Sequence, residues 1–406
     1  MATAPDMTVP RGDHAPVFDF DIYADPRIGE DIQGDYAHVL ADVPPVFWTP
    51  ANGGHWIVTG FEEIVEVVTN PQDFSAREMQ IPRVPDPPQF IPLSLDPPDN
   101  IPYRRILMPM FSPKAVRAMD DDLRRWANEL LDEVTVGKNQ CDFVDAVASR
   151  FSVTIFMRLM GMPVDRLREF REIADEHFNA RTPEDFGRVV PRILGIVDEL
   201  IALRRTQPGE DIISKLIAAD FDETRKLTHE EVQRICFLLF LGGMDTVTNV
   251  SGFAFRNLAQ DPELQRELAE NPARIPQFVD ESLRMFGVIS TPRLVVREAE
   301  RFGVTFRPGE MVLCVLALAG RDARRNPDPA RFDLDRSDSA HLTFSSGPHL
   351  CLGHILARAE LRVLTEEWLR RVPRFEIASD QSCRFRLGTV NALLSLPLIW
   401  EGGKGA

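Results

Sequence analysis

Hydrophobic residues recur along most of the chain at the spacing of amphipathic helices, three and four positions apart. This spacing is found over residues 61–68, 120–134, 143–160, 164–178 and 188–205. Apolar runs of strand length occur over residues 54–59, 311–319 and 392–399. We therefore expect a mainly α-helical fold with small β-sheets at one edge.

The longest apolar segment begins at Thr228, and Glu231 three positions later completes the signature of a capping box. Residues 236–244 are apolar apart from two glycines, and the pattern continues to about Leu258. A helix that is apolar on all sides is buried in the centre of a large protein. We therefore expect one long central helix. Pro102 fits the first turn of another helix, and the proline-rich residues 81–98 are predicted to form a loop.

Composition fits one large globular unit. The chain has 406 residues, of which 44% are hydrophobic and 27% are charged, and no linker or repeat divides it. We expect a single domain over residues 1–406, with residues 1–15 as a flexible N-terminus. The net charge of −16 argues against a nucleic-acid partner. No basic segment followed by an apolar stretch opens the chain, so we expect neither a signal peptide nor a membrane anchor.

The cysteines do not form a disulfide or zinc pattern. Five are present, an odd number, and they are widely spaced. A reducing cytoplasm fits this usage. Cys351 differs from the others because Phe344, Gly347 and Gly353 surround it at fixed offsets and a helix is predicted immediately afterwards. The N–H groups at a helix N-terminus favour a thiolate, which is a strong ligand for iron. The alternative is an inert buried cysteine, the usual state of a free thiol.

The segment from Phe344 to Gly353 resembles the haem-binding loop of the cytochrome P450 monooxygenases. The resemblance implies the P450 fold, with haem b between the long central helix and the cysteine loop, and Cys351 as the axial ligand of the iron. It implies that Phe344 packs beside the macrocycle, that Gly347 permits a turn, and that Gly353 allows close backbone approach.

Inside the long helix, the resemblance assigns the oxygen-activating site. Gly242 and Gly243 would make space beside the iron, and Thr246 would hydrogen-bond the oxygen that is being activated. Asp245 would connect this site to solvent protons, with Asn249 one turn later. The alternative is a helix kink in which Thr246 bonds back to a carbonyl one turn earlier.

Charged and polar residues complete the haem site by resemblance. Glu281, Arg284 and Arg336 would form a buried network that braces the cysteine loop, and such a network is stable only if fully paired. The expected contacts to the haem propionates are Asn100, Arg104, Arg293 and His349. For each arginine the alternative is an ordinary surface charge.

The chain most resembles the camphor-hydroxylating bacterial enzyme and its relatives, which are soluble. That enzyme has a hydrogen-bonding tyrosine in its substrate loop, whereas Pro88 occupies the position here. Camphor itself is therefore not expected, and the pocket is expected to select by shape. We predict a small hydrophobic substrate of the terpenoid or norisoprenoid type. The candidate walls, which could equally be core, are Met79, Leu238, Leu241, Ile289, Val390 and Leu396.

The family resemblance also implies partners. Two electrons would come from a [2Fe–2S] ferredoxin with an NAD(P)H-dependent reductase, and O2 would be the co-substrate of a cytoplasmic monomer. A basic patch for the ferredoxin would consist of Arg104, Arg105, Lys114 and Arg358. Two alternatives remain open: a peroxide-dependent haem-thiolate enzyme, which the Asp245–Thr246 pair argues against, and a non-catalytic haem gas sensor.

Overall fold

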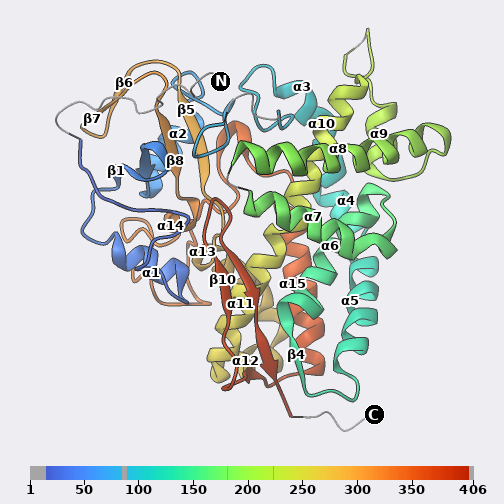
Figure 1. Cartoon of the computed structure of the whole chain (residues 1–406). Coiled ribbons are helices and arrows are strands. Elements are labelled where there is room, and N and C mark those ends of the chain that lie inside the picture. Colours follow the sequence, from blue (N-terminus) through green and yellow to red (C-terminus); the bar gives the residue numbers. More distant parts are fainter. Residues whose placement is uncertain (1–14, 85–88, 181, 223, 402–406) are drawn as a thin grey trace.

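Most of the helices lie on one side of the molecule, and the largest sheet lies on the other with a few short helices (Figure 1). The computed structural model describes residues 15–84, 89–180, 182–222 and 224–401. Residues 1–14, for which we expected flexibility, and Pro88 lie outside the described residues. About 51% of the chain is helical, which confirms the mainly α fold with small sheets.

Each segment with helical hydrophobic spacing contains a helix, and further helices occur outside these segments. Their bounds are α1 Ile32–Val39, α2 Phe61–Thr69, α3 Ile101–Leu107, α4 Pro113–Arg117, α5 Asp120–Thr135, α6 Arg150–Met160, α7 Leu167–Asn179, α8 Pro183–Thr206, α9 Ile212–Ala218, α10 His229–Met244, α11 Thr246–Gln260, α12 Pro262–Glu270, α13 Ile275–Met285, α14 Leu316–Ala319 and α15 His354–Arg371. Pro102 lies in the first turn of α3, as predicted. A π-helical segment, Val144–Ser149, precedes α6 within the predicted helix 143–160.

The largest sheet has the strand order β1-β2-β8-β5-β3, in which only β2 and β8 are parallel. Trp56 faces Val312 in that parallel pair, and Thr291 faces Cys314 between β5 and β8. Its strands are β1 Val46–Thr49, β2 His55–Val58, β3 Phe74–Ser75, β5 Thr291–Val295 and β8 Met311–Cys314. The smaller sheets contain β4 Gln140–Asp142, β9 Glu376–Ile377 and β12 Pro397–Ile399; β6 Ala299–Arg301 and β7 Val304–Phe306; and β10 Arg384–Arg386 and β11 Ala392–Ser395.

Two strand predictions were too long. The strand predicted over 311–319 ends at Cys314, and its leucine- and alanine-rich second half forms α14, as helix propensity favours. The run 392–399 divides at Leu396 into β11 and β12, which belong to different sheets. The Leu396 N–H donates to the Asp142 carboxylate, and its carbonyl accepts from the Phe143 N–H, so its backbone leaves the ladder.

The predicted central helix is present but is broken in two. The capping box at its start is formed, because the Thr228 N–H donates to Glu231 at 2.7 Å and the Glu231 N–H donates to the Thr228 hydroxyl. Asp245 then departs from helical geometry, with φ −130° and ψ −36°, and separates α10 from α11. The two helices run end to end through the molecule (Figure 1). The prediction of one continuous helix was therefore wrong at this residue.

One stretch is long and apolar enough to cross a membrane by length and composition alone. It is His229–Gln260, the α10–α11 pair, and 67% of its most apolar window is buried inside the protein. A core helix passes the same test, and burial at this position agrees with the sequence-based expectation of a central helix.

Candidate functional site

Cys351 lies in a tight loop that leads directly into α15. The Cys351 N–H donates to the Phe344 carbonyl at 2.9 Å, which closes the loop. Ser345 and Gly347 have positive φ angles of 61° and 64°. A side chain at Gly347 would also come within 2.8 Å of Thr69, so glycine is required there. A Cβ at Gly353 would meet no described atom closer than the Cys351 sulfur at 3.9 Å, which agrees with a close-approach role.

The groups around Cys351 shift the pKa of its thiol in opposite directions. The surrounding protein raises the pKa of the thiol, although the residue keeps accessible surface, while the N–H groups of Gly353 and His354 and the charge of Arg104 lower it. Burial outweighs the donors, so the net pKa is raised. The expectation that the helix N-terminus alone favours the thiolate was therefore incomplete. A metal ion at the sulfur would supply the additional positive charge that deprotonates a coordinating thiol.

Three of the residues expected to hold the propionates are buried, and two of them have a side-chain nitrogen without a hydrogen-bond partner among the described residues. Asn100 and Arg293 are each 1% exposed, and His349 is 6% exposed. The side-chain nitrogen of Asn100 and Nε2 of His349 have no hydrogen-bond partner among the described residues. Arg293 donates to the Thr291 hydroxyl and the Pro292 carbonyl, but no carboxylate of the described chain lies within ion-pair distance. Buried polar groups and charges are normally paired, so these residues fit an anionic group such as a haem propionate.

Arg104, the fourth expected propionate contact, is hydrogen-bonded to the cysteine loop. Its Nη2 donates to the carbonyl of Leu350 at 2.7 Å, next to Cys351. Burial, together with the charges of Arg293 and Arg104, lowers the pKa of His349 to about 3. His349 is therefore a neutral donor or acceptor beside two arginines. The structure thus brings together the expected propionate contacts and Cys351, and this donor set fits a haem.

The break between α10 and α11 presents a hydroxyl and an open glycine. The Thr246 hydroxyl donates to the Gly242 carbonyl at 2.9 Å, which is the back-bond expected of a kink. Gly242 is exposed although α10 is largely buried, and a Cβ built there would meet no atom within 4 Å. Gly243 differs, because a Cβ there would come within 2.1 Å of the Phe156 ring. Gly242 therefore borders open space, whereas Gly243 is needed for packing against α6, contrary to its expected role.

Asp245 is part of a chain of charges that reaches the surface. Its carboxylate lies 2.8 Å from Arg386 Nη2 of β10, and Arg386 lies 3.9 Å from Asp175, whose side chain is 55% exposed. Burial raises the pKa of Asp245, while Arg386 and Asn249 oppose that rise. Arg386 was not predicted as a site residue, because it lies outside the strand predicted over 392–399 and belongs to no recognised motif.

The network behind the cysteine loop is fully paired, as its stability requires. Glu281 is bonded to Arg284 at 2.7 Å and to Arg336 at 3.2 Å, and all three side chains are less than 10% exposed. Arg284 also donates to three carbonyls between residues 320 and 331, and Arg336 to three between 327 and 331. Burial would raise the pKa of Glu281, but its hydrogen bonds and the two arginines lower it overall. The network therefore anchors the segment that precedes Phe344.

The expected substrate walls do not all border open space. Ile289 and Val390 face each other in an isolated bridge and are partly exposed, as are Met79 and Leu238, while Leu241 is 7% exposed. Leu396 is completely buried in the core beside Phe143, so it presents no surface to a ligand. Its place among the pocket walls is not supported.

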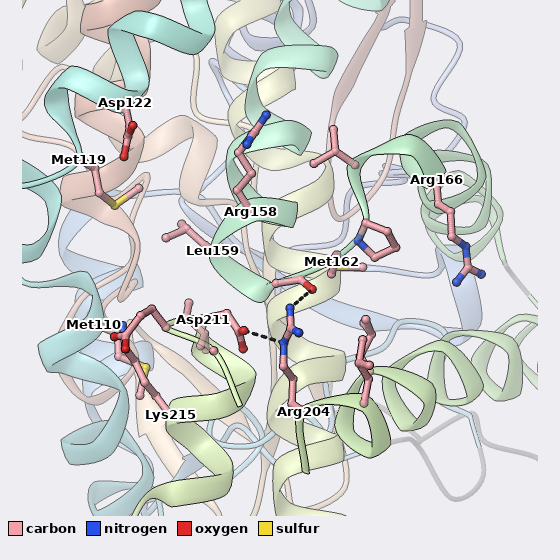
Figure 2. Close-up of a pocket in the computed structure, with 18 of the residues that line it drawn as sticks. Met110, Met119, Asp122, Arg158, Leu159, Met162, Arg166, Arg204, Asp211 and Lys215 are labelled. Carbon is pink, nitrogen blue, oxygen red and sulfur yellow. Dashed lines mark hydrogen bonds and ion pairs between the residues drawn. The ribbon is translucent and has the colours of Figure 1, made fainter. Parts of the chain in front are cut away.

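A separate groove of about 1070 Å³ lies between α4, α5, α6, α8 and α9, and none of the predicted site residues lines it. Figure 2 shows Arg204 on one wall, bonded to Asp211 and to a carbonyl across the groove. Among its charged lining residues, Arg204 pairs with Asp211 and Arg166 pairs with Glu199. We do not assign the site to this groove.

Comparisons with known proteins agree with the geometry. The family model described as cytochrome P450 matches residues 177–387. The curated protein named "Probable cytochrome P450 127A1" from Sinorhizobium fredii is 31% identical, and the alignment covers 97% of each chain. The crystal structure of CYP101J2 has a TM-score of 0.86 at 34% identity and covers 97% of this chain and 100% of that one. The structure of CYP101C1 has a TM-score of 0.86 at 30% identity, with coverage of 95% and 98%. Both belong to the camphor-type group that the sequence resembles.

Proposed function

The chain belongs to the cytochrome P450 family, and from this membership we propose that it hydroxylates a small hydrophobic terpenoid or norisoprenoid with O2 and two electrons from a ferredoxin. Its class, a P450 monooxygenase that binds haem b, follows from the family. The main support for a monooxygenase reaction is the break between α10 and α11. The Thr246 hydroxyl and the buried Asp245 carboxylate lie next to each other there.

The haem would be held by residues from several parts of the chain. Cys351 would ligate the iron, Arg104, Arg293, His349 and Asn100 would bind the propionates, and the open face of Gly242 would border the opposite side. When bound, the haem supplies the redox-active iron at which dioxygen is reduced and cleaved. The Glu281 network would keep Cys351 in position because it fixes the preceding segment on both sides.

Proton delivery is the task that we assign to the helix break. Asp175 exchanges protons with solvent, and Arg386 lies between Asp175 and the Asp245 carboxylate. Because burial raises the pKa of Asp245, its carboxyl can carry a proton closer to neutral pH than an exposed aspartate can. The Thr246 hydroxyl, positioned by the Gly242 carbonyl, would aim that proton at the reacting oxygen. This acid–alcohol pair favours a monooxygenase over a peroxide-dependent enzyme or a gas sensor.

The substrate side of the site is apolar. On α10, Leu238 lies one turn before Gly242 and Leu241 lies immediately before it. Met79 comes from a loop, and Ile289 and Val390 come from two segments joined by an isolated bridge. Hydrophobic walls of this kind bind a small apolar molecule mainly by packing. We keep the terpenoid or norisoprenoid class as the proposed substrate and leave Leu396 out of the pocket.

A ferredoxin would dock beside the cysteine loop. Arg105 and Lys114 are exposed, and no described carboxylate lies within ion-pair distance of either. Arg358 is less available, because it pairs with Asp280 at 3.1 Å and packs on the Phe344 ring. Exposed Met108 and Leu350 add apolar surface near these charges. An acidic [2Fe–2S] ferredoxin fits such a patch. We further propose a soluble, cytoplasmic monomer that binds no nucleic acid.

The absorption spectrum of the reduced, carbon-monoxide-bound protein tests the haem assignment. Wild type is expected to show the strongly red-shifted Soret band of a thiolate ligand, and Cys351→Ala is expected to lose it. Turnover is then compared between a ferredoxin system with O2 and hydrogen peroxide alone. Activity with peroxide only would favour the peroxide-dependent enzyme, and a normal spectrum without turnover in either system would favour the gas sensor.

A further inference from the structure

A small cavity of about 110 Å³ lies beside the C-terminal end of α7. Met79, Gln80 and Phe90 line it from the substrate loop, His177 lines it from α7, and Thr389 lines it from the turn before Val390. Phe90 and His177 both pack on Phe237 of α10, at ring distances of 5.4 and 5.9 Å. The cavity therefore adjoins the helix that carries Leu238, Leu241 and Gly242.

Two residues that line this cavity, His177 and Gln80, each have a buried polar atom with no hydrogen-bond partner among the described residues. His177 is 8% exposed and is surrounded by the rings of Phe178, Phe186 and Phe237, all in edge-to-face contact. Its Nδ1 is buried and forms no hydrogen bond with the described residues, and the same holds for Oε1 of Gln80. Buried polar atoms in native proteins are nearly always hydrogen-bonded. We therefore take these two atoms as the candidate partners of a ligand group in the cavity.

We propose that this cavity binds a hydroxyl group of the hydrophobic substrate, which donates to Gln80 Oε1 and accepts from His177 Nδ1–H. This inference rests on the function proposed above and narrows its substrate class to a terpenoid alcohol. A cavity of this size holds one end of such a molecule and leaves the hydrocarbon to the apolar walls around Leu238. The pocket would then select by a hydrogen bond as well as by shape.

The chemistry of the two atoms separates an alcohol from a ketone. A glutamine oxygen only accepts, whereas a neutral imidazole Nδ1 donates in one tautomer and accepts in the other. With the amide oxygen of Gln80 facing the cavity, a ketone has no hydrogen to donate to it, so that oxygen would stay unpaired. No charged side chain occurs among the described lining residues, which suits an uncharged group. Burial lowers the pKa of His177 to about 4, so the ring is neutral at physiological pH.

Borneol and camphor test the proposal, because they place a hydroxyl and a ketone on the same bicyclic skeleton. Their dissociation constants are measured with the haem-loaded protein by the low-spin to high-spin shift and by isothermal titration calorimetry. Wild type is expected to bind borneol about tenfold or more tightly than camphor. His177→Phe and Gln80→Leu are each expected to weaken borneol about tenfold while changing camphor less than about threefold.

His55→Phe is the matched control. His55 is also buried with unpaired ring nitrogens, but it lies in β2 and does not line the cavity. Its replacement is expected to leave the preference for borneol unchanged. Equal affinity of wild type for both probes, no binding of borneol, or equal losses for both probes in the variants would show that water alone satisfies these atoms, and would overturn the proposal. Loss of the carbon-monoxide spectrum in wild type would instead contradict the proposed function.

Discussion

Arg386 Nη2 lies 2.8 Å from the Asp245 carboxylate, although 141 positions separate the two residues in the sequence. The side chains are only 10% and 12% exposed, so the pair is shielded from solvent screening. Asp245 also interrupts the central helix, which directs its carboxylate toward β10. The helix break and the ion pair are thus one arrangement, and the proton route proposed above depends on both.

Removal of Arg386 is expected to change the pH dependence of turnover. Burial raises the pKa of Asp245 and Arg386 opposes that rise, so Arg386→Gln will raise the pKa further. The pH profile of ferredoxin-supported turnover should therefore move to higher pH. Arg384→Gln is the control, because Arg384 is exposed and lies two residues away on the same strand. A profile that shifts equally in both variants, or in neither, would rule out a direct effect of Arg386 on Asp245.

Thr246→Ala is expected to uncouple electron use from product formation. The hydroxyl that the Gly242 carbonyl positions is lost, so protons are no longer directed to the reacting oxygen. NAD(P)H consumption should continue, while product per NAD(P)H falls about tenfold or more and hydrogen peroxide appears. Thr246→Ser keeps the hydroxyl and should restore most of the coupling. If Thr246→Ala remains fully coupled, the hydroxyl has no role in proton delivery.

Glu360 of α15 is expected to make the protein less stable as pH rises. The carboxyl is 4% exposed, one oxygen has no partner among the described residues, and burial raises its pKa from 4.5 to about 8, opposed by a hydrogen bond with Ser152. A carboxyl with a raised folded pKa holds more protons in the folded state, so stability falls between pH 4.5 and about 8. The loss would be on the order of a few kcal/mol.

The isosteric Glu360→Gln variant isolates this contribution. Its thermal unfolding midpoint should exceed that of wild type increasingly from pH 6 to pH 8.5, because the amide cannot ionise. A constant difference across this range would mean that Glu360 does not titrate there.

Glu281→Gln is expected to destabilise the cysteine loop. It removes the only described carboxylate that pairs with buried Arg284 and Arg336, and breaking a buried ion pair costs about 3–5 kcal/mol. The haem-loaded protein should unfold at lower temperature and lose haem faster. Glu263→Gln is the matched control, since the Glu263–Arg266 pair has the same spacing but is exposed. Haem loss at the same rate in both variants would contradict the bracing role.

Parts of the site whose residues lie close together in the chain could be predicted from the sequence. The Cys351 loop, the Thr228–Glu231 cap and the Glu281–Arg284 pair each depend on local spacing, and the structure forms all of them. Arg386 could not be predicted, because only tertiary folding brings β10 to the helix break.

Residues with similar local sequence also proved to have different surroundings. Gly242 and Gly243 are adjacent and chemically identical, yet one faces open space and the other packs against Phe156. Leu396 and Leu238 are both leucines in apolar runs, but only Leu396 is fully enclosed by the core. Which neighbour a side chain meets is decided by packing between elements, and the hydrophobic pattern does not contain that information.

Replacement of Arg293 is expected to change the thermal unfolding midpoint differently in the haem-free and the haem-loaded protein. The guanidinium is 1% exposed and has no described carboxylate partner, and burial lowers its pKa. An unpaired buried charge is destabilising, so Arg293→Met should raise or preserve the unfolding midpoint of the haem-free protein. With haem bound, the same change removes a propionate contact, so haem should dissociate faster and the midpoint should fall. Thermal unfolding of both forms and the rate of haem transfer to apomyoglobin measure these effects. A fall in both forms would mean that Arg293 stabilises the fold itself, and a rise in both forms would mean that it does not bind the propionate.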